Sequence, residues 1–156
     1  MIIRLSEFFE EDLFISELKA KDKVGALKEM TEALVNSKRL KHGEGLYEML
    51  QQRESLGSTG IGRGVAVPHG RTLAISRLTV IFARSEAGVE FDSMDGKPVH
   101  LLFMTVAPPQ ERANLYLPVL GKIVETVKSA KTRRQLLKAS DFDEITEILE
   151  EADEGA

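Results

Sequence analysis

The sequence contains no cysteine and no tryptophan, and its aromatic residues are seven phenylalanines and two tyrosines among 156 residues. The absence of cysteine excludes disulfides, thiolate metal sites and cysteine nucleophiles. Few aromatic rings leave little surface on which bases or sugars can stack. Because a chain without disulfides fits a reducing compartment, we expect the protein to be cytoplasmic.

An excess of basic charge and a long apolar run are missing as well. The 21 basic residues are outnumbered by 25 acidic ones, and the formal net charge is −4. A nucleic-acid binder needs a basic patch, so we expect no direct contact with nucleic acid. No stretch approaches the roughly 18 apolar residues of a membrane span. Residues 1–12 turn acidic where a signal peptide starts basic, so we expect no insertion into a membrane.

The length and the hydrophobic pattern predict a single domain over residues 1–156. Apolar residues at helical spacing predict five helices, at 22–36, 46–54, 114–127, around 135–137 and at 142–149. Asp22 is the expected N-cap of the first helix, and Asn114 or a neighbour that of the third. Apolar runs predict strands at 13–18, 65–67, 78–83, 89–91 and 99–106. This loose alternation predicts an α/β fold, a mixed β-sheet flanked by helices on both faces.

The chain is organised around residues 53–70, which read RESLGSTGIGRGVAVPHG. A glycine-rich loop leads into a β-branched run and then to His69, which stands between a proline and a glycine. Glycine tolerates positive φ and close approach, so the loop N–H groups and the hydroxyls of Ser58 and Thr59 can surround an anion. The proline fixes φ and the glycine frees the chain, so a constrained turn presents the imidazole. We predict a histidine nucleophile beside a phosphate-binding loop.

Other interpretations of these residues are weaker. His42 lies in an interhelix turn and His100 inside an apolar strand, which are typical solvated and structural positions. The glycines lack the spacing of a Walker loop or of a dinucleotide fingerprint. No cluster of further histidines or carboxylates follows the motif, so we predict neither a metal nor a cofactor. The basic groups nearby belong to Arg53, Arg63 and Arg71, and a guanidinium suits phosphate oxygens.

The stretch from Arg53 to Gly70 resembles the signature of type-2 enzyme IIA domains of the bacterial phosphoenolpyruvate-dependent phosphotransferase system. These are the fructose–mannitol type and its nitrogen-related relatives. An arginine and a glutamate precede a Ser-Thr-Gly-Ile-Gly loop, which leads into Pro-His-Gly. The resemblance extends weakly over nearly the whole chain, including residues 91–96 and the strand that ends in Ala107-Pro108. It implies a mixed sheet between helices.

The resemblance also implies a function, that of a phosphoryl carrier. The histidine would accept a phosphoryl group from the phosphohistidine of the carrier protein HPr and pass it to an enzyme IIB. The residues that it assigns to the site are His69 and Arg53 for catalysis, Ser58, Thr59 and Gly60 for phosphate binding, and Glu54 and Asn114 behind them.

The chain departs from its relatives at one position. They usually carry a second histidine at the start of the helix after the Ala-Pro segment, and the matching position here is Asn114. Asparagine donates a hydrogen bond but cannot become cationic, as histidine does near its reference pKa of about 6.5. This departure keeps an alternative open, a regulatory module whose protein contacts depend on phosphorylation of His69, with little or no role in sugar transport. A small α/β domain with an unrelated ligand is the third interpretation.

Overall fold

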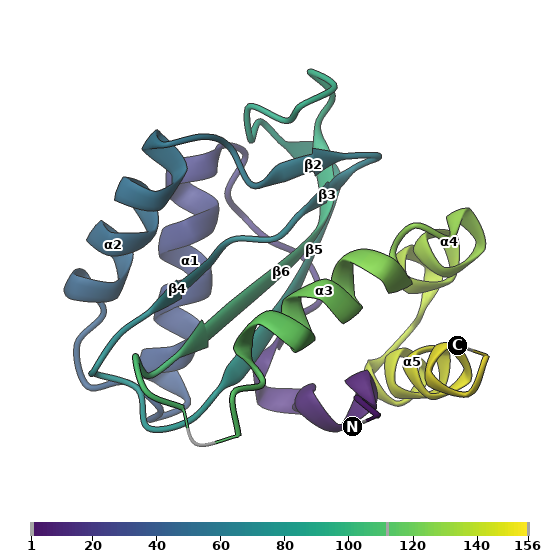
Figure 1. The fold of residues 1–156 in the computed structure, drawn as a ribbon. Coiled ribbons are helices and arrows are strands. Elements are labelled where there is room, and N and C mark those ends of the chain that lie inside the picture. Colours follow the sequence, from purple (N-terminus) through teal and green to yellow (C-terminus); the bar gives the residue numbers. More distant parts are fainter. Residues whose placement is uncertain (1, 112, 156) are drawn as a thin grey trace.

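A computed structural model describes residues 2–111 and 113–155 and shows a mixed β-sheet between two layers of helices (Figure 1). The elements follow one another as two short 3₁₀ helices at Leu5–Phe8 and Glu11–Leu13, then β1 (Phe14–Ile15), α1 (Lys23–Asn36), α2 (Glu44–Ser55), β2 (Gly60–Gly62), β3 (Val65–Ala66), β4 (His69–Arg71), β5 (Thr79–Val89), β6 (Val99–Ala107), α3 (Tyr116–Thr126), α4 (Ala130–Lys138) and α5 (Phe142–Glu154).

Strand β6 is the centre of the sheet. It pairs with β5 in the antiparallel direction and with β3 and β4 in the parallel direction. Beyond β5 lies β1, which covers only two residues of the strand expected at 13–18. Beyond β3 lies β2, its antiparallel neighbour. The predicted central strand at 99–106 and the mixed sheet are therefore confirmed.

Strands β3 and β4 follow the same edge of β6, and β4 places His69 opposite Thr105. The ladder is interrupted just before β4, at Pro68, because proline has no N–H to donate. The carbonyl of Pro68 still accepts the N–H of Thr105 at 3.0 Å. The pairing with the central strand thus fixes the position of His69 along the sheet.

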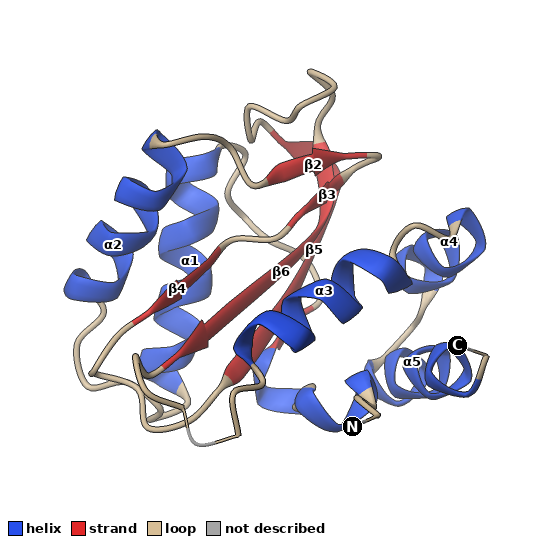
Figure 2. Ribbon diagram, in the orientation of Figure 1, coloured by secondary structure: helices blue, strands red, loops and turns tan. Residues whose placement is uncertain are grey.

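Helices cover both faces of the sheet (Figure 2). Because side chains alternate along a strand, Leu102 and Met104 of β6 pack under α1 and α2, whereas Leu101 and Phe103 pack on the side of α3 and α5. The second side includes a phenylalanine cluster, in which the rings of Phe103 and Phe82 stack at 4.7 Å between centroids. The expected arrangement, with helices on both faces, is confirmed.

Side chains cap three of the helices as their sequences suggest. The carboxylate of Asp22 accepts the N–H of Gly25 at 2.8 Å and begins α1, which confirms the predicted N-cap. Ser129 and Asp141 cap α4 and α5 in the same way. Within the described residues, none of these helices combines the length and the apolar character that crossing a bilayer requires.

The N-cap of α3 is Leu115, the neighbour of Asn114. Asn114 has a left-handed backbone, with φ of 51°, and lies before the N-cap position. Its neighbour Leu115 donates its N–H to the carboxylate of Glu111 at 2.6 Å. Asn114 is therefore not the cap, because the preceding loop brings a longer acidic side chain back to the start of the helix.

Strand β5 is longer than the sequence indicates. The expected strand at 78–83 continues to Val89, so a separate edge strand at 89–91 was wrong. The polar residues after Ala83 suggested an end to the strand. Arg84 is nevertheless buried, because its guanidinium donates to the carbonyls of Leu136 and Ala139 at 2.9 and 2.8 Å. These acceptors lie some fifty residues away, and no local pattern indicates them.

Candidate functional site

The glycine-rich segment contains a β-hairpin, which corrects the expectation of one open loop. Gly60–Gly62 forms β2 and pairs with β3. The turn between them has Arg63 at φ 58° and Gly64 at φ 78°, the two left-handed residues that a tight hairpin of type I′ needs. Some of the glycines therefore serve the turn and the sheet. The open part of the segment is limited to the residues between α2 and β2.

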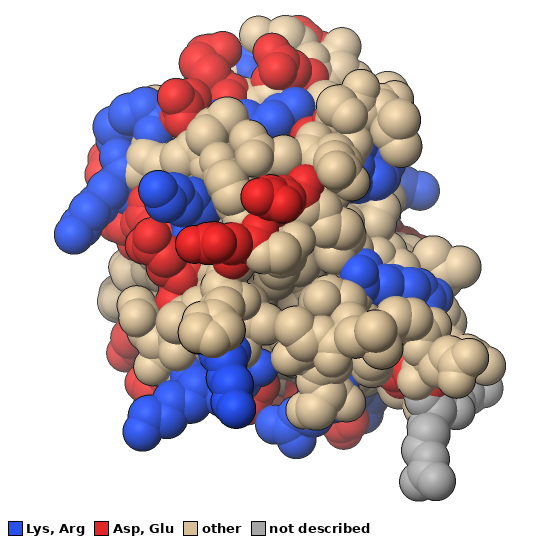
Figure 3. All heavy atoms as spheres, turned by 90° about the vertical axis from the view of Figure 1, so that its left-hand side faces the viewer, with Lys and Arg blue, Asp and Glu red and all other residues tan. Residues whose placement is uncertain are grey.

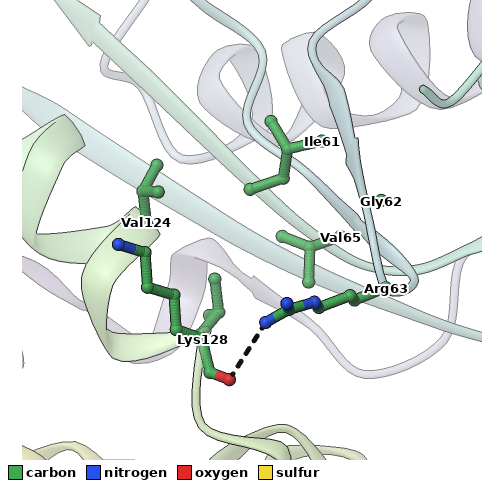
Figure 4. Close-up of a pocket in the computed structure, with 7 residues that line it drawn as sticks. Ile61, Gly62, Arg63, Val65, Val124 and Lys128 are labelled. Carbon is green, nitrogen blue, oxygen red and sulfur yellow. Dashed lines mark hydrogen bonds between the residues drawn. The ribbon is translucent and has the colours of Figure 1, made fainter. Parts of the chain in front are cut away.

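A pocket of about 300 Å³ lies beside this hairpin (Figure 4). Arg63 reaches across it towards the carbonyl of Lys128, at 3.5 Å. The other residues that line it are Ile61, Gly62, Val65, Val124 and Val127. His69 is not among them, so this hollow is separate from the predicted nucleophile.

Glu54 fixes the start of the hairpin relative to α2. Its carboxylate is 7% exposed and accepts both the N–H of Thr59, at 2.9 Å, and the Thr59 hydroxyl. The ammonium group of Lys23 lies 3.3 Å away. A buried carboxylate persists only with such partners. Glu54 therefore ties α1, α2 and the glycine segment together.

The other predicted phosphate-binding residues also have partners within the protein. The hydroxyl of Ser58 donates to the carbonyl of Phe91 at 2.7 Å and accepts the N–H of Gly60 at 3.0 Å. A Cβ at Gly60 would lie 2.6 Å from the hydroxyl of Ser93, so only glycine fits there. These contacts shape the segment between α2 and β2. The role of Ser58, Thr59 and Gly60 in binding phosphate stays a prediction.

The hydrogen bond of His69 identifies its reactive nitrogen. The imidazole is half-buried, and its Nδ1 lies 2.8 Å from the carbonyl oxygen of Val67. A carbonyl oxygen only accepts, so Nδ1 must carry the proton and donate it. Nε2 then keeps its lone pair and is free to act as a nucleophile. The expectation that a backbone carbonyl could hold the tautomer is confirmed.

Gly70 serves packing, not a turn. It lies within β4, on the opposite face from His69, where an added Cβ would overlap the sulfur of Met49 on α2. The absence of a side chain lets α2 lie directly against β4. The expected constrained turn around His69 is thus a short strand.

Tyr116, at the start of α3, lies beside His69. Their ring centroids are 6.2 Å apart and the rings meet edge to face at 63°. The guanidinium of Arg71 lies over the same tyrosine ring, with Cζ 4.3 Å from its centroid. Arg71 is also held by the carbonyl of Pro109, to which it donates at 3.0 Å. Because side chains alternate along β4, His69 and Arg71 share one face of the strand.

The pKa of Tyr116 is shifted by burial and by two arginines. Burial raises the pKa of the Tyr116 hydroxyl above its ordinary value, and the positive charges of Arg71 and Arg53 partly lower it. The phenol therefore keeps its proton at neutral pH. Arg53 lies in the last turn of α2 and donates to the carbonyl of Gly57 at 2.9 Å. The pairing of Arg53 with His69 in one site stays a prediction.

The remaining candidates are placed elsewhere or differently. Asn114 is exposed, two residues before Tyr116. His42 is exposed in the loop between α1 and α2, and the Nδ1 of His100 lies 2.8 Å from the carbonyl of Ser85. Among the described residues, no group of three or more His, Cys, Asp or Glu side chains is placed to hold a metal ion.

Sequence reasoning missed Tyr116 as a site residue and left Arg71 unassigned. A signal for the tyrosine was present, since it is one of only two in the chain and stands at the start of the helix after the Ala-Pro-Pro segment. The surface on the α2 side of the molecule carries basic and acidic side chains intermixed (Figure 3). That face therefore shows no large patch of one charge.

Comparison with known proteins agrees with this fold. Residues 7–152 match the family described as "Phosphoenolpyruvate-dependent sugar phosphotransferase system, EIIA 2". The fructose-specific EIIABC component of Bacillus subtilis (strain 168) is 31% identical over 151 residues, which are 97% of this chain and 24% of that protein. The crystal structure of the nitrogen regulatory protein IIA-Ntr from Neisseria meningitidis is 32% identical, with a TM-score of 0.84, over 93% of this chain and 98% of that one.

A third similar structure is the complex of enzyme IIAMTL and phosphorylated enzyme IIBMTL from Escherichia coli. It has a TM-score of 0.73 at 21% identity and covers 90% of this chain and 96% of that one, which shows a shared fold. The chain belongs to the type-2 EIIA family of the phosphoenolpyruvate-dependent sugar phosphotransferase system. It spans about a quarter of the length of the Bacillus relative.

The buried carboxylate of Glu54 gives a first testable prediction. Replacing Glu54 by Ala leaves the Thr59 N–H without its partner and the Lys23 ammonium with only Asp92, which should lower the free energy of unfolding by about 2–4 kcal/mol. Glu54→Gln keeps one acceptor and should lose less. Urea unfolding measures both, with the exposed Glu48→Ala as control, expected within about 0.5 kcal/mol of the parent. Equal stability of Glu54→Ala and Glu48→Ala would contradict the assigned role.

The Tyr116 hydroxyl gives a second prediction. Its tyrosinate absorbance, taken as the difference between the parent and Tyr116→Phe during alkaline titration, should have a midpoint above the ordinary value of about 10. Because folding raises this pKa, the group's contribution to stability is present below about pH 10 and is lost as the pH rises through the folded value. A midpoint at or below pH 10 would show that the phenol is not buried as described.

Proposed function

We propose that this chain is a phosphoryl carrier, in which His69 accepts a phosphoryl group from an HPr-type phosphocarrier protein and passes it to an enzyme IIB. The observation that carries the proposal is the hydrogen bond from His69 Nδ1 to the carbonyl of Val67. In the neutral imidazole this bond leaves the lone pair on Nε2, which is the form that a nucleophile requires. We further propose that residues 1–156 act as one domain in the cytoplasm.

Transfer proceeds by in-line attack of Nε2 on phosphorus. The new N–P bond forms as the bond to the donor imidazole breaks, and that imidazole leaves with the electron pair as a neutral group. In the second transfer, the acceptor attacks phosphorus in line with the N–P bond, and His69 leaves as the neutral imidazole. In such reactions, positioning and charge stabilisation supply most of the catalysis. No further reactant is needed, because the phosphoryl group moves between nucleophiles of similar leaving ability.

Arg53 steadies the transferred group in this proposal. A phosphoryl group brings roughly −1.5 to −2 charges, by analogy with other phosphorylated side chains. The guanidinium of Arg53 is already held by the carbonyl of Gly57, so it loses little freedom on binding an anion. Behind it, Glu54 keeps Thr59 and the following hairpin in place. In this proposal Ser58, Thr59 and Gly60 bind the phosphate oxygens, and Asn114 stands behind them on the exposed loop before α3.

Exposed apolar side chains next to the site support docking of another protein. Leu56, Leu73 and Leu117 are 86%, 90% and 68% exposed. In the sequence, Leu56 comes three residues after Arg53. Leu73 comes two residues after Arg71, and Leu117 directly follows Tyr116. Exposed apolar groups around a polar centre are typical of protein interaction sites. The phosphorylated IIB in the related complex indicates the class of acceptor.

A second function is favoured by the similarity to IIA-Ntr, a nitrogen regulatory protein by name. In this alternative the chain is a regulatory module whose contacts depend on the phosphorylation of His69. Affinity capture with phosphorylated and unphosphorylated protein separates the two functions. A carrier retains an enzyme IIB, whereas a regulator retains a different target in one phosphorylation state only.

Phosphorylation of the purified chain tests the carrier function. Incubation with phosphoenolpyruvate, enzyme I and HPr should give an acid-labile, base-stable adduct, and His69→Ala should abolish it. Arg53→Ala should slow its formation by about 10- to 100-fold while the fold stays intact, since a hydrogen bond to a charged group is worth about 1.5–3 kcal/mol. His42→Ala, in an exposed loop, is the matched control and should label normally. An adduct that persists in His69→Ala would sink the assignment.

A further inference from the structure

Arg71 is placed beside the nucleophile and is held there by two contacts. It lies two residues after His69 on β4, so their Cβ atoms share one face at a separation of about 6.6 Å. Its guanidinium covers the ring of Tyr116 and donates to the carbonyl of Pro109. Within residues 2–111 and 113–155, no carboxylate forms an ion pair with it. An exposed cation without an acidic partner therefore lies on the same face of β4 as His69, and both side chains pack on Tyr116.

Tyr116 is the side chain that both groups touch. Its ring meets the imidazole edge to face and carries the guanidinium on its surface. The ring is buried, and it is anchored by Ala107 and Leu120. Because the Nδ1 bond to Val67 already restricts the imidazole, contact with a fixed ring leaves Nε2 little freedom to turn. The ring of Tyr116, at the start of α3, thus restricts the orientation of the imidazole on β4.

We propose that Arg71, held over the ring of Tyr116, binds the phosphoryl group carried by Nε2 of His69, and that Tyr116 positions both His69 and Arg71. This inference rests on the proposed function, because it requires a phosphoryl group on His69. The site would then have two guanidinium groups, Arg53 from α2 and Arg71 from β4.

Two guanidinium groups suit the charge of the ligand better than one. A phosphoryl group with roughly −1.5 to −2 charges exceeds the single charge of Arg53. Guanidinium groups present planar donors that match phosphate oxygens, and a cation held on an aromatic face keeps its orientation. The Tyr116 phenol stays protonated and neutral, so it adds no repulsion to the bound anion. The ring of Tyr116, more than its hydroxyl, carries the positioning role.

The test uses the full chain and two phosphoryl donors, phospho-HPr and phosphoramidate. Phosphoramidate is a small donor that needs no docking surface, so a defect with both donors lies in the site itself. Arg71→Met should slow formation of the adduct roughly tenfold with each donor, as expected for the loss of one charge-assisted hydrogen bond at an exposed position. Arg71→Lys keeps the charge but loses the planar contact, and it should fall between Met and the parent.

Substitutions at Tyr116 separate its ring from its hydroxyl. Tyr116→Phe keeps the ring and should stay within about twofold of the parent rate, whereas Tyr116→Leu should match Arg71→Met. The ³¹P resonance of the phosphohistidine should move in Arg71→Met and in Tyr116→Leu, and should stay in place in Tyr116→Phe. Thermal unfolding checks that Tyr116→Leu is folded. Because Arg71 is exposed, its variants should fold normally, and they test the phosphoryl contact even if Tyr116→Leu does not fold.

The control is Arg134→Met, an arginine on α4 that lines a pocket with Arg63 and Arg133, away from β4 in Figure 1. It should label at the parent rate with both donors. If Arg71→Met labels as fast as the parent while His69→Ala does not label, the inference is wrong and the carrier function stands. If Arg134→Met slows labelling as much as Arg71→Met, a general charge effect replaces the proposed contact. If His69→Ala labels normally, the proposed function itself fails.

Discussion

The pairing of β4 with the central strand β6 is the constraint on which the site depends. It begins just after Pro68 and places His69 opposite Thr105. The carbonyl of Val67, two residues before His69, accepts the proton of Nδ1. The same short segment therefore presents the imidazole and holds its tautomer.

The two helical layers approach this strand from opposite faces, and each supplies part of the site. On one face, the absence of a side chain at Gly70 lets α2 lie against β4, and the buried carboxylate of Glu54 holds the end of α2 to the glycine segment. Arg53 is positioned by that same last turn. On the other face, α3 begins with Tyr116 against His69. The nucleophile is thus set between groups whose positions depend on packing across the whole sheet.

Much of the fold followed from local pattern, and the failures have a common cause. The capped helix after Asp22 and the apolar strand β6 each satisfy their own hydrogen bonds and burial within a short segment, so the sequence predicts them. Strand β5 beyond Ala83 was missed because Arg84 is satisfied by carbonyls of a helix that follows much later. For the site, the motif predicted His69 and Arg53 together. Tyr116 depends on how the loop after β6 folds back, which spacing does not specify.

Tyr116 and Arg71 set the charge expected around the phosphoryl group. A second histidine near His69 would change its charge near its ordinary pKa of about 6.5, so its help to an anion would vary within the physiological range. A phenol whose pKa is raised by burial stays neutral there, and a guanidinium stays charged. Asn114 at the position expected for that histidine therefore does not leave His69 without a neighbouring cation, because Arg71 lies over the ring of Tyr116, which packs beside His69.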